Sequence, residues 1–314
     1  MLKIAIQMDP ITSVNVAADT SFDMALEAHG RGHAIWVYQP QSLQLKGADV
    51  VTRAQKVEEI RRNQGDHVRL GAPETVDLST LDVVLIRQDP PFDMAYITAA
   101  QILERLTPDV LVLNNPRAIR DAPEKLFVTE FLDLTPPTLI TADIHSIRAF
   151  RAEHSDIILK PLYGNGGAGV FRIKPDDGNF NALLELFAET FREPIIAQKF
   201  VPAVTKGDKR IILLDGEAVG AINRVPAAGE TRSNMHVGGR AEAVEMNARD
   251  QEICDRIGPV LSKRGLVFAG IDVIGEFLTE INVTSPTGVQ EVRRFGGADI
   301  SALFWDWVEG QRSA

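Results

Sequence analysis

The chain has 314 residues, of which 45% are hydrophobic and 24% are charged, a balance typical of globular proteins without long disordered segments. A single hydrophobic core rarely serves a chain of this length, so we expect two or three packed domains. The net charge of −10, together with the lack of any run of Lys and Arg, argues against nucleic acid and membrane surfaces as partners.

The start of the sequence and its cysteine content favour a cytoplasmic location. The apolar run at residues 2–6 soon meets Asp9 and Pro10, which is unlike a signal peptide, and no apolar run approaches the roughly 20 residues that cross a bilayer. The single cysteine, Cys254, cannot form an internal disulfide, which fits a reducing compartment. Apolar residues surround Cys254 at helical spacing, so we expect a buried thiol rather than a catalytic nucleophile.

The first third of the chain alternates short apolar runs with amphipathic helical patterns, which predicts an open parallel α/β sheet. The predicted strands are 2–8, 34–38, 83–86 and 110–113, and the predicted helices are 22–28 and 96–106. In such sheets, ligands sit beyond the carboxyl ends of the strands. Asp9, Arg87 and Asp89 follow two of these ends and are candidate substrate residues. The alternative is that Asp9 and Asp89 only cap turns, as Asp before Pro often does.

The middle of the chain has a different pattern and is predicted to begin a second, smaller domain. The expected elements are helix 124–131, strand 138–141, helix 143–153 with Asp143 as its N-cap, and strand 157–161. A glycine-rich turn at 164–169 separates the last strand from a further one at 170–173. We therefore expect these two strands to pair antiparallel.

The last third is predicted to contain a second set of strands with two helices. Strands 211–214 and 218–225 join through Asp215-Gly216, a pair of residues typical of hairpin turns. A glycine-rich segment at 226–240 follows. The remaining expected elements are helix 248–264, an apolar strand within 266–274, strand 277–283 and a terminal helix that ends near residue 309.

The glycines at 164–169 can bring bare backbone amides close to phosphates. The turn lacks the Gly-Lys-Ser/Thr ending of a P-loop and joins two strands, so a mobile hairpin is the alternative interpretation. Lys160 at the end of the preceding strand and Lys125 on an earlier helix favour phosphate binding, because ammonium groups suit nucleotide phosphates as point charges.

Two further segments suggest ligand contacts. Residues 195–202 are a strand that continues into an extended stretch, whose free backbone groups could contact an adenine edge; a plain linker is the alternative. Arg210 enters the next strand, where it could place a fixed cation over a reacting carbonyl or simply reach solvent at the sheet edge. Arg224, Arg232 and Arg240 concentrate positive charge in an acidic chain, which indicates a substrate with several carboxylates.

Asp272, Glu280 and Asn282 form the most specific pattern in the sequence. Glu280 and Asn282 project from the same face of one predicted strand, and Asp272 on the neighbouring strand can meet them. Two carboxylates and an amide oxygen suit Mg²⁺, which keeps few protein ligands and takes others from phosphates and water. The alternative is a surface strand with polar outer positions, but the adjoining run at 266–274 is too apolar for that.

These features resemble the ATP-grasp ligases and, more narrowly, the bacterial glutathione synthetases. The likeness covers nearly the whole chain. It rests on Met8-Asp9-Pro10-Ile11, Arg87-Gln88-Asp89-Pro90-Pro91-Phe92-Asp93, Glu124-Lys125-Leu126, residues 156–161, the glycines of 164–169, Gly207-Asp208-Lys209-Arg210, Gly229-Glu230-Thr231-Arg232, Gly238-Gly239-Arg240 and residues 279–287.

The resemblance implies a role for each candidate residue. ATP would be bound by Lys125, Lys160, Gly164, Gly166, Gly167, Gln198, Lys199, Phe200, Val201 and Asp208. Mg²⁺, with Mn²⁺ as a possible substitute, would be held by Asp272, Glu280 and Asn282. The substrate would be contacted by Asp9, Arg87, Asp89, Arg224, Arg232, Gly239, Arg240, Ser285, Pro286 and Thr287, with Arg210 as the catalytic residue.

The resemblance also implies a homotetramer of three-domain chains. We expect an N-terminal substrate domain at 1–122 with an open parallel α/β sheet. An ATP-grasp module of two α+β subdomains would follow, with a lid subdomain at 123–202 and a catalytic subdomain at 203–314 that carries a mobile loop at 225–240.

The implied activity is the ATP-dependent joining of γ-glutamylcysteine and glycine through an acyl phosphate, giving glutathione, ADP and phosphate. No Ser-His-Asp or Cys-His set is evident, which fits a phosphoryl transfer that needs mainly positioning and electrostatics. A D-alanine:D-alanine ligase is the nearest rival, and the substrate-side loops argue against it. A second alternative is a module that binds ATP without catalysis. It is disfavoured because binding alone would not require Arg210, Glu280 and Asn282.

Overall fold

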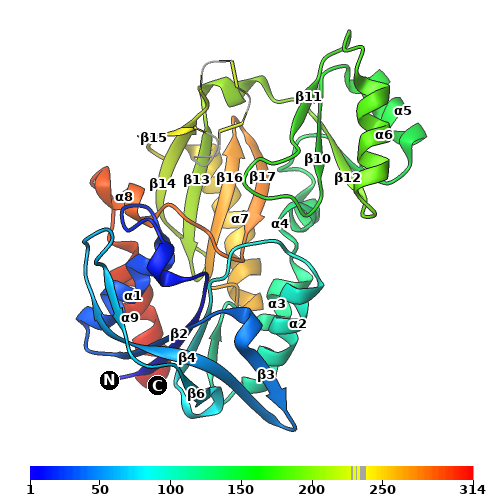
Figure 1. The fold of residues 1–314 in the computed structure, drawn as a ribbon. Helices are drawn as coiled ribbons and strands as arrows, with labels where there is room; N and C mark the ends of the chain where they lie inside the picture. Colours follow the sequence, from blue (N-terminus) through cyan, green and yellow to red (C-terminus); the bar gives the residue numbers. More distant parts are fainter. Residues whose placement is uncertain (228, 231, 234–237, 314) are drawn as a thin grey trace.

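The computed structural model describes residues 1–227, 229–230, 232–233 and 238–313, in which three β-sheets are surrounded by helices (Figure 1). Part of the predicted mobile loop 225–240, namely residues 228, 231 and 234–237, lies outside these ranges. The sheets follow one another along the chain, and we call them the first, second and third sheets.

The first sheet contains the four predicted parallel strands. They are β1 (Lys3–Gln7), β2 (Ala34–Tyr38), β7 (Val83–Ile86) and β8 (Leu111–Leu113), in the spatial order β2-β1-β7-β8. β1 lies in the middle and pairs in parallel with both β2 and β7. Its residues 4–7 are fully buried, as expected for a strand that is covered on both faces. The parallel core of this domain is confirmed.

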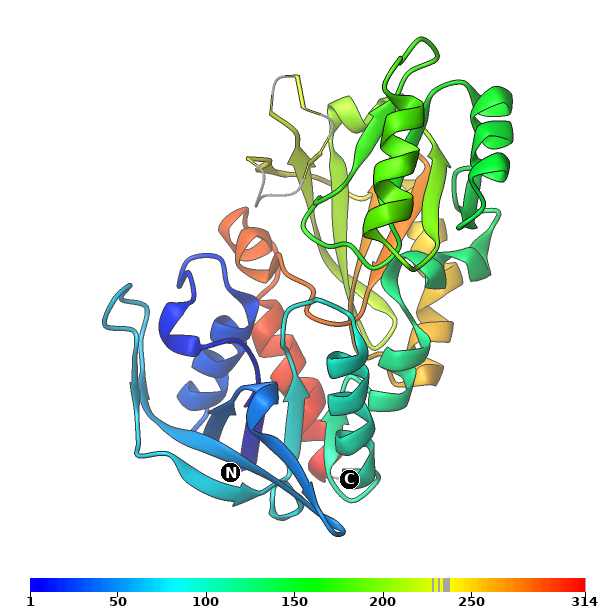
Figure 2. The ribbon, with the colours of Figure 1, turned by 45° about the vertical axis from the view of Figure 1, so that its right-hand side comes forward.

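The first sheet also has an antiparallel part that the sequence analysis did not predict. It consists of β3 (Leu43–Lys46), β4 (Asp49–Ile60), β5 (Val68–Leu70) and β6 (Glu74–Asp77). β4 pairs antiparallel with β2, so the sheet is mixed rather than purely parallel, and Figure 2 shows these strands in blue and cyan across its lower part. Polar and buried residues alternate along β4, as expected for a strand with one covered face. The prediction, which relied on continuous apolar runs, missed it.

The second sheet is antiparallel, with the order β11-β10-β12-β9. Its strands are β9 (Thr138–Thr141), β10 (Ile157–Pro161), β11 (Phe171–Ile173) and β12 (Ile195–Lys199), and its helices are α5 (Ile144–His154) and α6 (Phe180–Thr190). The predicted antiparallel pairing of the strands on either side of the glycine-rich turn is confirmed. Asp143 accepts hydrogen bonds from the amides of His145 and Ser146, so it is the N-cap of α5 as predicted.

The third sheet is also antiparallel, with the order β15-β14-β13-β16-β17. Its strands are β13 (Asp208–Leu214), β14 (Glu217–Val225), β15 (Arg240–Ala243), β16 (Phe268–Ile274) and β17 (Phe277–Asn282). The predicted hairpin turn has positive φ at both Asp215 (47°) and Gly216 (87°), which matches the twist of the flanking strands. Helix α7 (Ala248–Arg264) contains Cys254, whose thiol is buried as expected.

The remaining helices pack around the first sheet or contact the third sheet. They are α1 (Thr20–Gly30), α2 (Met94–Leu103), α3 (Pro116–Asp121), α4 (Glu124–Phe127), α8 (Val289–Arg294) and α9 (Ile300–Ser313). The single terminal helix of the sequence analysis is thus two helices, separated at Gly296-Gly297. Across the residues described, no helix is both long and apolar enough to span a membrane.

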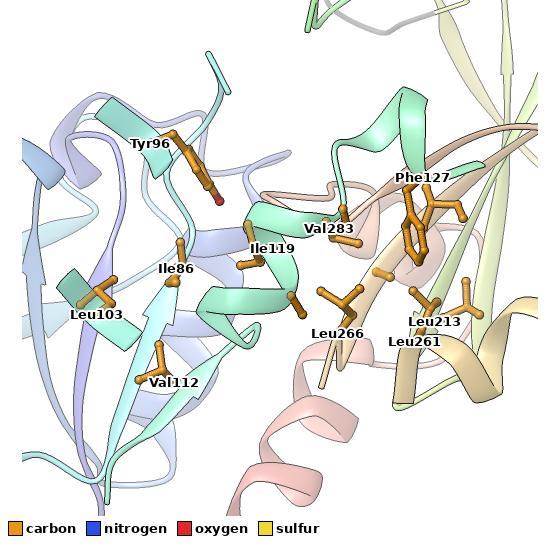
Figure 3. Close-up of a cluster of buried hydrophobic side chains, with 14 of the residues drawn as sticks. Ile86, Tyr96, Leu103, Val112, Ile119, Phe127, Leu213, Leu261, Leu266 and Val283 are labelled. Carbon is orange, nitrogen blue, oxygen red and sulfur yellow. The ribbon is translucent and has the colours of Figure 1, made fainter. Parts of the chain in front are cut away.

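Buried side chains join the first and third sheets. One hydrophobic cluster runs from Ile86 and Val112, through Ile119, to Leu213 and Val283 (Figure 3). α9 lies beside α1 (Figure 1), and the indole of Trp305 on α9 donates a hydrogen bond of 2.8 Å to the carbonyl of Met24 on α1. The second sheet has a separate hydrophobic cluster of its own. The first and third sheets therefore share core packing that the second does not.

Asn114 is a polar link inside this shared core. It follows β8, is 5% exposed, and its amide nitrogen donates to the carbonyls of Phe268 (2.7 Å) and Val283 (2.8 Å). Its amide oxygen accepts from the backbone nitrogen of Phe268 at 2.8 Å. One side chain of the N-terminal domain thereby satisfies backbone groups of the third sheet and of the segment that follows it.

Replacing Asn114 by Ala should lower the free energy of unfolding by about 2–4 kcal/mol, because buried backbone groups of Phe268 and Val283 would lose their partners. Urea unfolding measures the change. Asn181→Ala, which alters an exposed asparagine on α6, should stay within about 0.5 kcal/mol of the parent protein. Equal stability of the two variants would show that the Asn114 link contributes little.

Candidate active site

A large cavity lies between the second and third sheets, with an empty volume of about 1550 Å³ when its open mouth is included. One wall comes from β10, β12 and the glycine-rich turn, and the other from β13, β14, β16 and β17. Helix α4 and the Asp89-Pro90 loop of the N-terminal domain complete it. All three parts of the chain therefore contribute to one site.

Two lysines from different elements face one carboxylate. Lys125 Nζ on α4 lies 3.4 Å from Glu280 Oε1 on β17, and Lys160 Nζ on β10 lies 3.9 Å from the same oxygen. Burial lowers the pKa of Lys160 below its ordinary value. For Lys125, burial has the same tendency, but Glu280 outweighs it and the pKa is raised. This end of the cavity can neutralise an anionic ligand such as phosphate.

The glycine-rich turn lies beside these lysines. Lys125 Nζ donates a hydrogen bond to the carbonyl of Gly164, and Gly166, Gly167 and Gly169 have positive φ values of 60°, 80° and 69°. A Cβ on Gly169 would lie 2.9 Å from a side-chain carbon of Pro161, so the turn requires glycine there. Gly164, Gly166 and Gly167 line the cavity, where their small size leaves the backbone open to a ligand.

Two arginines and two aspartates form a buried network on the opposite wall. Arg210 Nε lies 2.6 Å from Asp272 Oδ1, and Arg224 Nη2 lies 2.6 Å from Asp208 Oδ2 and 2.9 Å from Asp272 Oδ2. Burial would raise the pKa of Asp272, but the two guanidinium groups hold it below its ordinary value. Burial raises the pKa of Asp208 to about 6, because Arg224 compensates only in part and Asp272 repels its charge.

The proposed metal ligands lie together at the junction of β16 and β17. Asp272 and Glu280 are partners in the strand pairing, and Asn282 pairs with Gly270 two residues along. The amide nitrogen of Asn282 is buried and finds no hydrogen-bond acceptor among the described residues. Because the two ends of an amide are assigned from their hydrogen bonds, its oxygen can occupy this position instead. That oxygen, together with Glu280, fits a hard divalent cation. Asp272 is engaged by two arginines and is the least available of the three.

The described part of the chain contains no cluster of three or more His, Cys, Asp or Glu side chains suited to a metal ion. A cation at Glu280 and Asn282 would therefore have few protein ligands. Mg²⁺ tolerates this, because it commonly completes its shell with water and substrate phosphates.

The predicted adenine segment also lines the cavity. Gln198, Lys199, Phe200 and Val201 contribute to its wall. They are joined by three apolar residues that the sequence analysis did not select: Ile158, Val170 and Ile274. Flat apolar surfaces with a nearby backbone edge suit a purine ring.

Six of the predicted substrate residues line the cavity. They are Asp89, Arg224, Arg232, Ser285, Pro286 and Thr287. Arg210 Nη1 donates to the carbonyl of Thr287 at 3.3 Å, so the catalytic candidate and the 285–287 segment are in direct contact. Arg232 Nη2 pairs with Glu230 Oε2 at 2.6 Å, and its Nη1 lies 3.5 Å from the carbonyl of Gly167.

Four of the predicted substrate residues do not line the cavity. Asp9 accepts a hydrogen bond of 3.0 Å from the backbone nitrogen of Asp89, a contact that holds the loop, as in the alternative interpretation. Arg87 is 6% exposed and donates to Ser21 Oγ and to the carbonyl of Pro286, both at 3.0 Å. The side chain of Arg240 is 76% exposed and pairs with Glu242, and Gly239 precedes it.

Sequence reasoning missed several lining residues besides the apolar ones. Glu124 lies next to Lys125 and accepts a hydrogen bond of 2.7 Å from Thr284 Oγ1, and burial raises its pKa. Ser233 Oγ donates to Asp208 Oδ2 at 2.8 Å. Glu124 and Thr284 both fall inside the motifs that suggested the family. Their positions in the sequence, close to Lys125 and Asn282, could have identified them as residues of the site.

The raised pKa of Asp208 predicts a pH effect on the ligand-free protein. An ordinary aspartate titrates near ~3.9. Between about pH 4 and pH 6, Asp208 is thus protonated in the folded chain and ionised in the unfolded chain. The folded chain binds more protons, so this group makes stability fall as pH rises across that window. Asp272, whose pKa is lowered in the folded chain, contributes a slope of the opposite sign only near the lower end of this window.

Asp208→Asn should therefore reduce the loss of stability between pH 4 and pH 6, measured by urea unfolding without nucleotide or divalent cation. The change is at most about 3 kcal/mol, the equivalent of two pKa units. Asp176→Asn, at an exposed position in a surface turn, is the control. If both variants follow the pH dependence of the parent chain, Asp208 does not titrate in this window.

Comparison with known families gives two matches. The model of the prokaryotic glutathione synthetase N-terminal domain matches residues 2–120, and that of the prokaryotic glutathione synthetase ATP-grasp domain matches residues 124–297.

Curated relatives match over almost the whole chain. The glutathione synthetase of Agrobacterium fabrum is 58% identical over 311 residues, which cover 99% of this chain and 97% of the relative. The glutathione synthetase of Mesorhizobium japonicum is 59% identical over 311 residues and 99% of each chain. The glutathione synthetase of Yersinia pestis is 43% identical over 312 residues and 98% of each chain.

Solved structures share the fold at low sequence identity. The D-cycloserine synthetase DcsG superposes with a TM-score of 0.67 at 15% identity, covering 99% of each chain. The ATP-grasp ligase PsnB in complex with a precursor peptide and AMPPNP superposes with a TM-score of 0.63 at 18% identity, covering 99% of this chain and 98% of that one.

Proposed function

Because the chain belongs to the prokaryotic glutathione synthetase family, we propose that its cavity joins γ-glutamylcysteine to glycine with the hydrolysis of ATP, giving glutathione, ADP and phosphate. The observation that carries this proposal is that one cavity contains both the lysine and glycine wall and the Arg210–Arg224 network. The first suits a nucleotide and the second suits an acyl substrate with carboxylates.

The nucleotide occupies the side formed by the second sheet and α4. Lys125 and Lys160 interact with its phosphates, and the glycine-rich turn covers them with backbone amides. Because burial lowers the pKa of Lys160, an anionic ligand nearby stabilises its charged form. Residues 198–201, with Ile158 and Ile274, hold the adenine.

Mg²⁺, or Mn²⁺ in its place, is held by Glu280 and Asn282, with Asp272 beside them. The described residues that line the cavity include six cationic and five acidic side chains, so the net charge of the wall is close to zero. The wall alone therefore does not balance the several negative charges of ATP. A divalent cation supplies the missing positive charge and fixes the phosphate oxygens. A related structure of the ATP-grasp ligase PsnB contains Mg and ADP, which supports this assignment.

The reaction begins when the cysteinyl carboxylate of γ-glutamylcysteine attacks the γ-phosphoryl group, giving an acyl phosphate and ADP. The amine of glycine then attacks the acyl carbon and phosphate leaves. Arg210 is a fixed cation for the oxyanion that forms in this step, because Asp272 and the carbonyl of Thr287 already orient its guanidinium group. Phosphoryl transfer needs positioning and charge stabilisation more than a protein nucleophile.

Substrate contacts come from residues around the arginine network. Arg224, Arg232 and the segment 285–287 line the cavity on this side, and Asp89 reaches it from the N-terminal domain. Arg87 and Asp9 act indirectly: Arg87 holds Pro286 in place, and Asp9 holds Asp89. Gly239 and Arg240 remain candidates that would contact substrate only if their segment approached the cavity.

ADP release tests the function. It should require γ-glutamylcysteine, glycine and Mg²⁺ together, and D-alanine should not replace either substrate. Glu280→Gln should abolish release at ordinary Mg²⁺ concentrations, while Glu276→Gln, in the exposed turn between β16 and β17, should leave it unchanged. Full release with a single substrate would exclude glutathione synthesis, and ATP binding without release under any condition would indicate a binding module.

Arg210→Ala should lower kcat by about 10²- to 10³-fold, as expected when a cation at a developing oxyanion is lost. The dissociation constant of ATP should change by less than about threefold, because Arg210 contacts Asp272 and Thr287 rather than the lysine wall. Stopped-time ADP assays and equilibrium dialysis measure the two quantities. An unchanged kcat would remove the oxyanion role from Arg210.

We further propose that the protein is a cytoplasmic homotetramer. Membership of the family supports both the oligomeric state and the location. The requirement for ATP also supports the location. Light scattering of the purified protein should give the mass of four chains, and the mass of one chain would contradict it. Cell fractionation tests the location.

A further inference from the structure

We propose that the ring contact between Tyr163 and Phe92 positions the glycine-rich turn against the substrate-side loop, and thereby sets the place of ATP relative to the acyl substrate. The two ring centroids are 6.1 Å apart with their planes inclined by 22°, a stacked arrangement. Tyr163 belongs to the second-sheet unit, and Phe92 belongs to the N-terminal domain. The inference rests on the proposed function, because it assigns ATP and acyl substrate to the two sides of the cavity.

The loop that carries Phe92 is firmly held. Its start is fixed by Arg87, which donates to the carbonyl of Pro286, and by the hydroxyl of Ser285, which donates to the carbonyl of Arg87 at 3.2 Å. The backbone nitrogen of Asp89 donates to Asp9. Phe92 itself packs on Tyr96, a buried residue of α2, with ring centroids 5.2 Å apart. Phe92 thus offers a fixed surface to whatever contacts it.

The glycine-rich turn is held at its start, where Lys125 Nζ donates to the carbonyl of Gly164, and at its end, where Gly169 packs on Pro161. Around Gly166, no other described atom lies within 4 Å of the position of a Cβ. Tyr163 directly precedes Gly164, and the glycines that follow have no side chains with which to pack. Gly166 and Gly167 have positive φ values that glycine adopts easily, so the backbone has alternatives to the present conformation. A ring placed immediately before such a turn limits those alternatives if it rests on a fixed partner.

The two segments lie on the same cavity. Asp89 and Pro90, ahead of Phe92, line it, as do Gly164 to Ala168, after Tyr163. The ring contact therefore joins the two segments that form the rim between the proposed substrate side and the proposed phosphate side, although neither ring itself lines the cavity. Tyr163 is 38% exposed and neither ring lines the cavity, so the contact lies outside the space where the reaction is proposed to occur. Tyr163 and Phe92 are accordingly positioning residues.

The test uses leucine in place of each ring, because leucine keeps apolar volume and supports folding while it removes stacking. Tyr163→Leu and Phe92→Leu should each raise the KM for ATP by about 2- to 10-fold, the range expected for an aromatic pair. Each should also increase ADP release that is not matched by glutathione, because a looser rim admits water to the acyl phosphate. The contact between Tyr163 and Phe92 is lost in both variants, and Phe92→Leu also loses the contact with Tyr96. The double variant should therefore be no more impaired than Phe92→Leu alone.

Tyr163→Phe keeps the ring and should restore parent values. Phe295→Leu, which alters a partly exposed ring away from the cavity, should have no effect. Additive effects of the two leucine variants, or a Tyr163→Phe variant as impaired as Tyr163→Leu, would overturn the inference. The proposed function is judged separately, because it fails only if the parent protein releases ADP without needing both substrates.

Discussion

Asp272 is a carboxylate removed from water at the centre of the third sheet, and the arrangement of the site depends on how its charge is compensated. A buried charge is stable only when opposite charges and donors replace the lost solvent. Arg210 on β13 and Arg224 on β14 supply that replacement, and Asp208 holds Arg224 in turn. A shift of one residue between these strands would turn the paired side chains to opposite faces, so the charge network also fixes strand register.

The rest of the site is assembled around this network from separate parts of the fold. Glu280, opposite Asp272 on β17, attracts Lys125 from α4 and Lys160 from the second sheet. The N-terminal domain reaches the same place through Arg87, which holds Pro286. Each part brings a cation or a donor to a group on the third sheet. The electrostatic balance of the cavity is therefore a property of the assembled chain and of none of its parts alone.

Sequence patterns predicted those features that a short stretch of chain determines. The buried strands β1 and β16, the Asp215-Gly216 turn and the Asp143 cap all follow from local periodicity or turn chemistry. The two-residue period of a strand placed Glu280 and Asn282 on one face, and the structure shows the expected pairing with the strand of Asp272. β4 was missed because its apolar residues alternate with polar ones.

Sequence patterns did not predict features that depend on contacts between residues far apart in the chain. Nothing local shows that Arg87 turns inward to Pro286, almost two hundred residues later, instead of facing the cavity. The contact between Glu124 and Thr284 spans a similar distance in sequence. The direction of a side chain at the end of a strand is decided by what lies beside it after folding, and sequence periodicity carries no information on that.

The packing of α9 on α1 has a consequence for how the protein is made. Trp305 and Val308 belong to the same buried cluster as Ile6 and Met24, so β1 and α1 lack part of their covering until α9, far later in the chain, has been synthesised. Domains usually complete their folding in the order of synthesis. Here β1 and α1 keep an apolar face open until α9 has been synthesised, so a chaperone that shields such faces would be needed on this part of the chain until then.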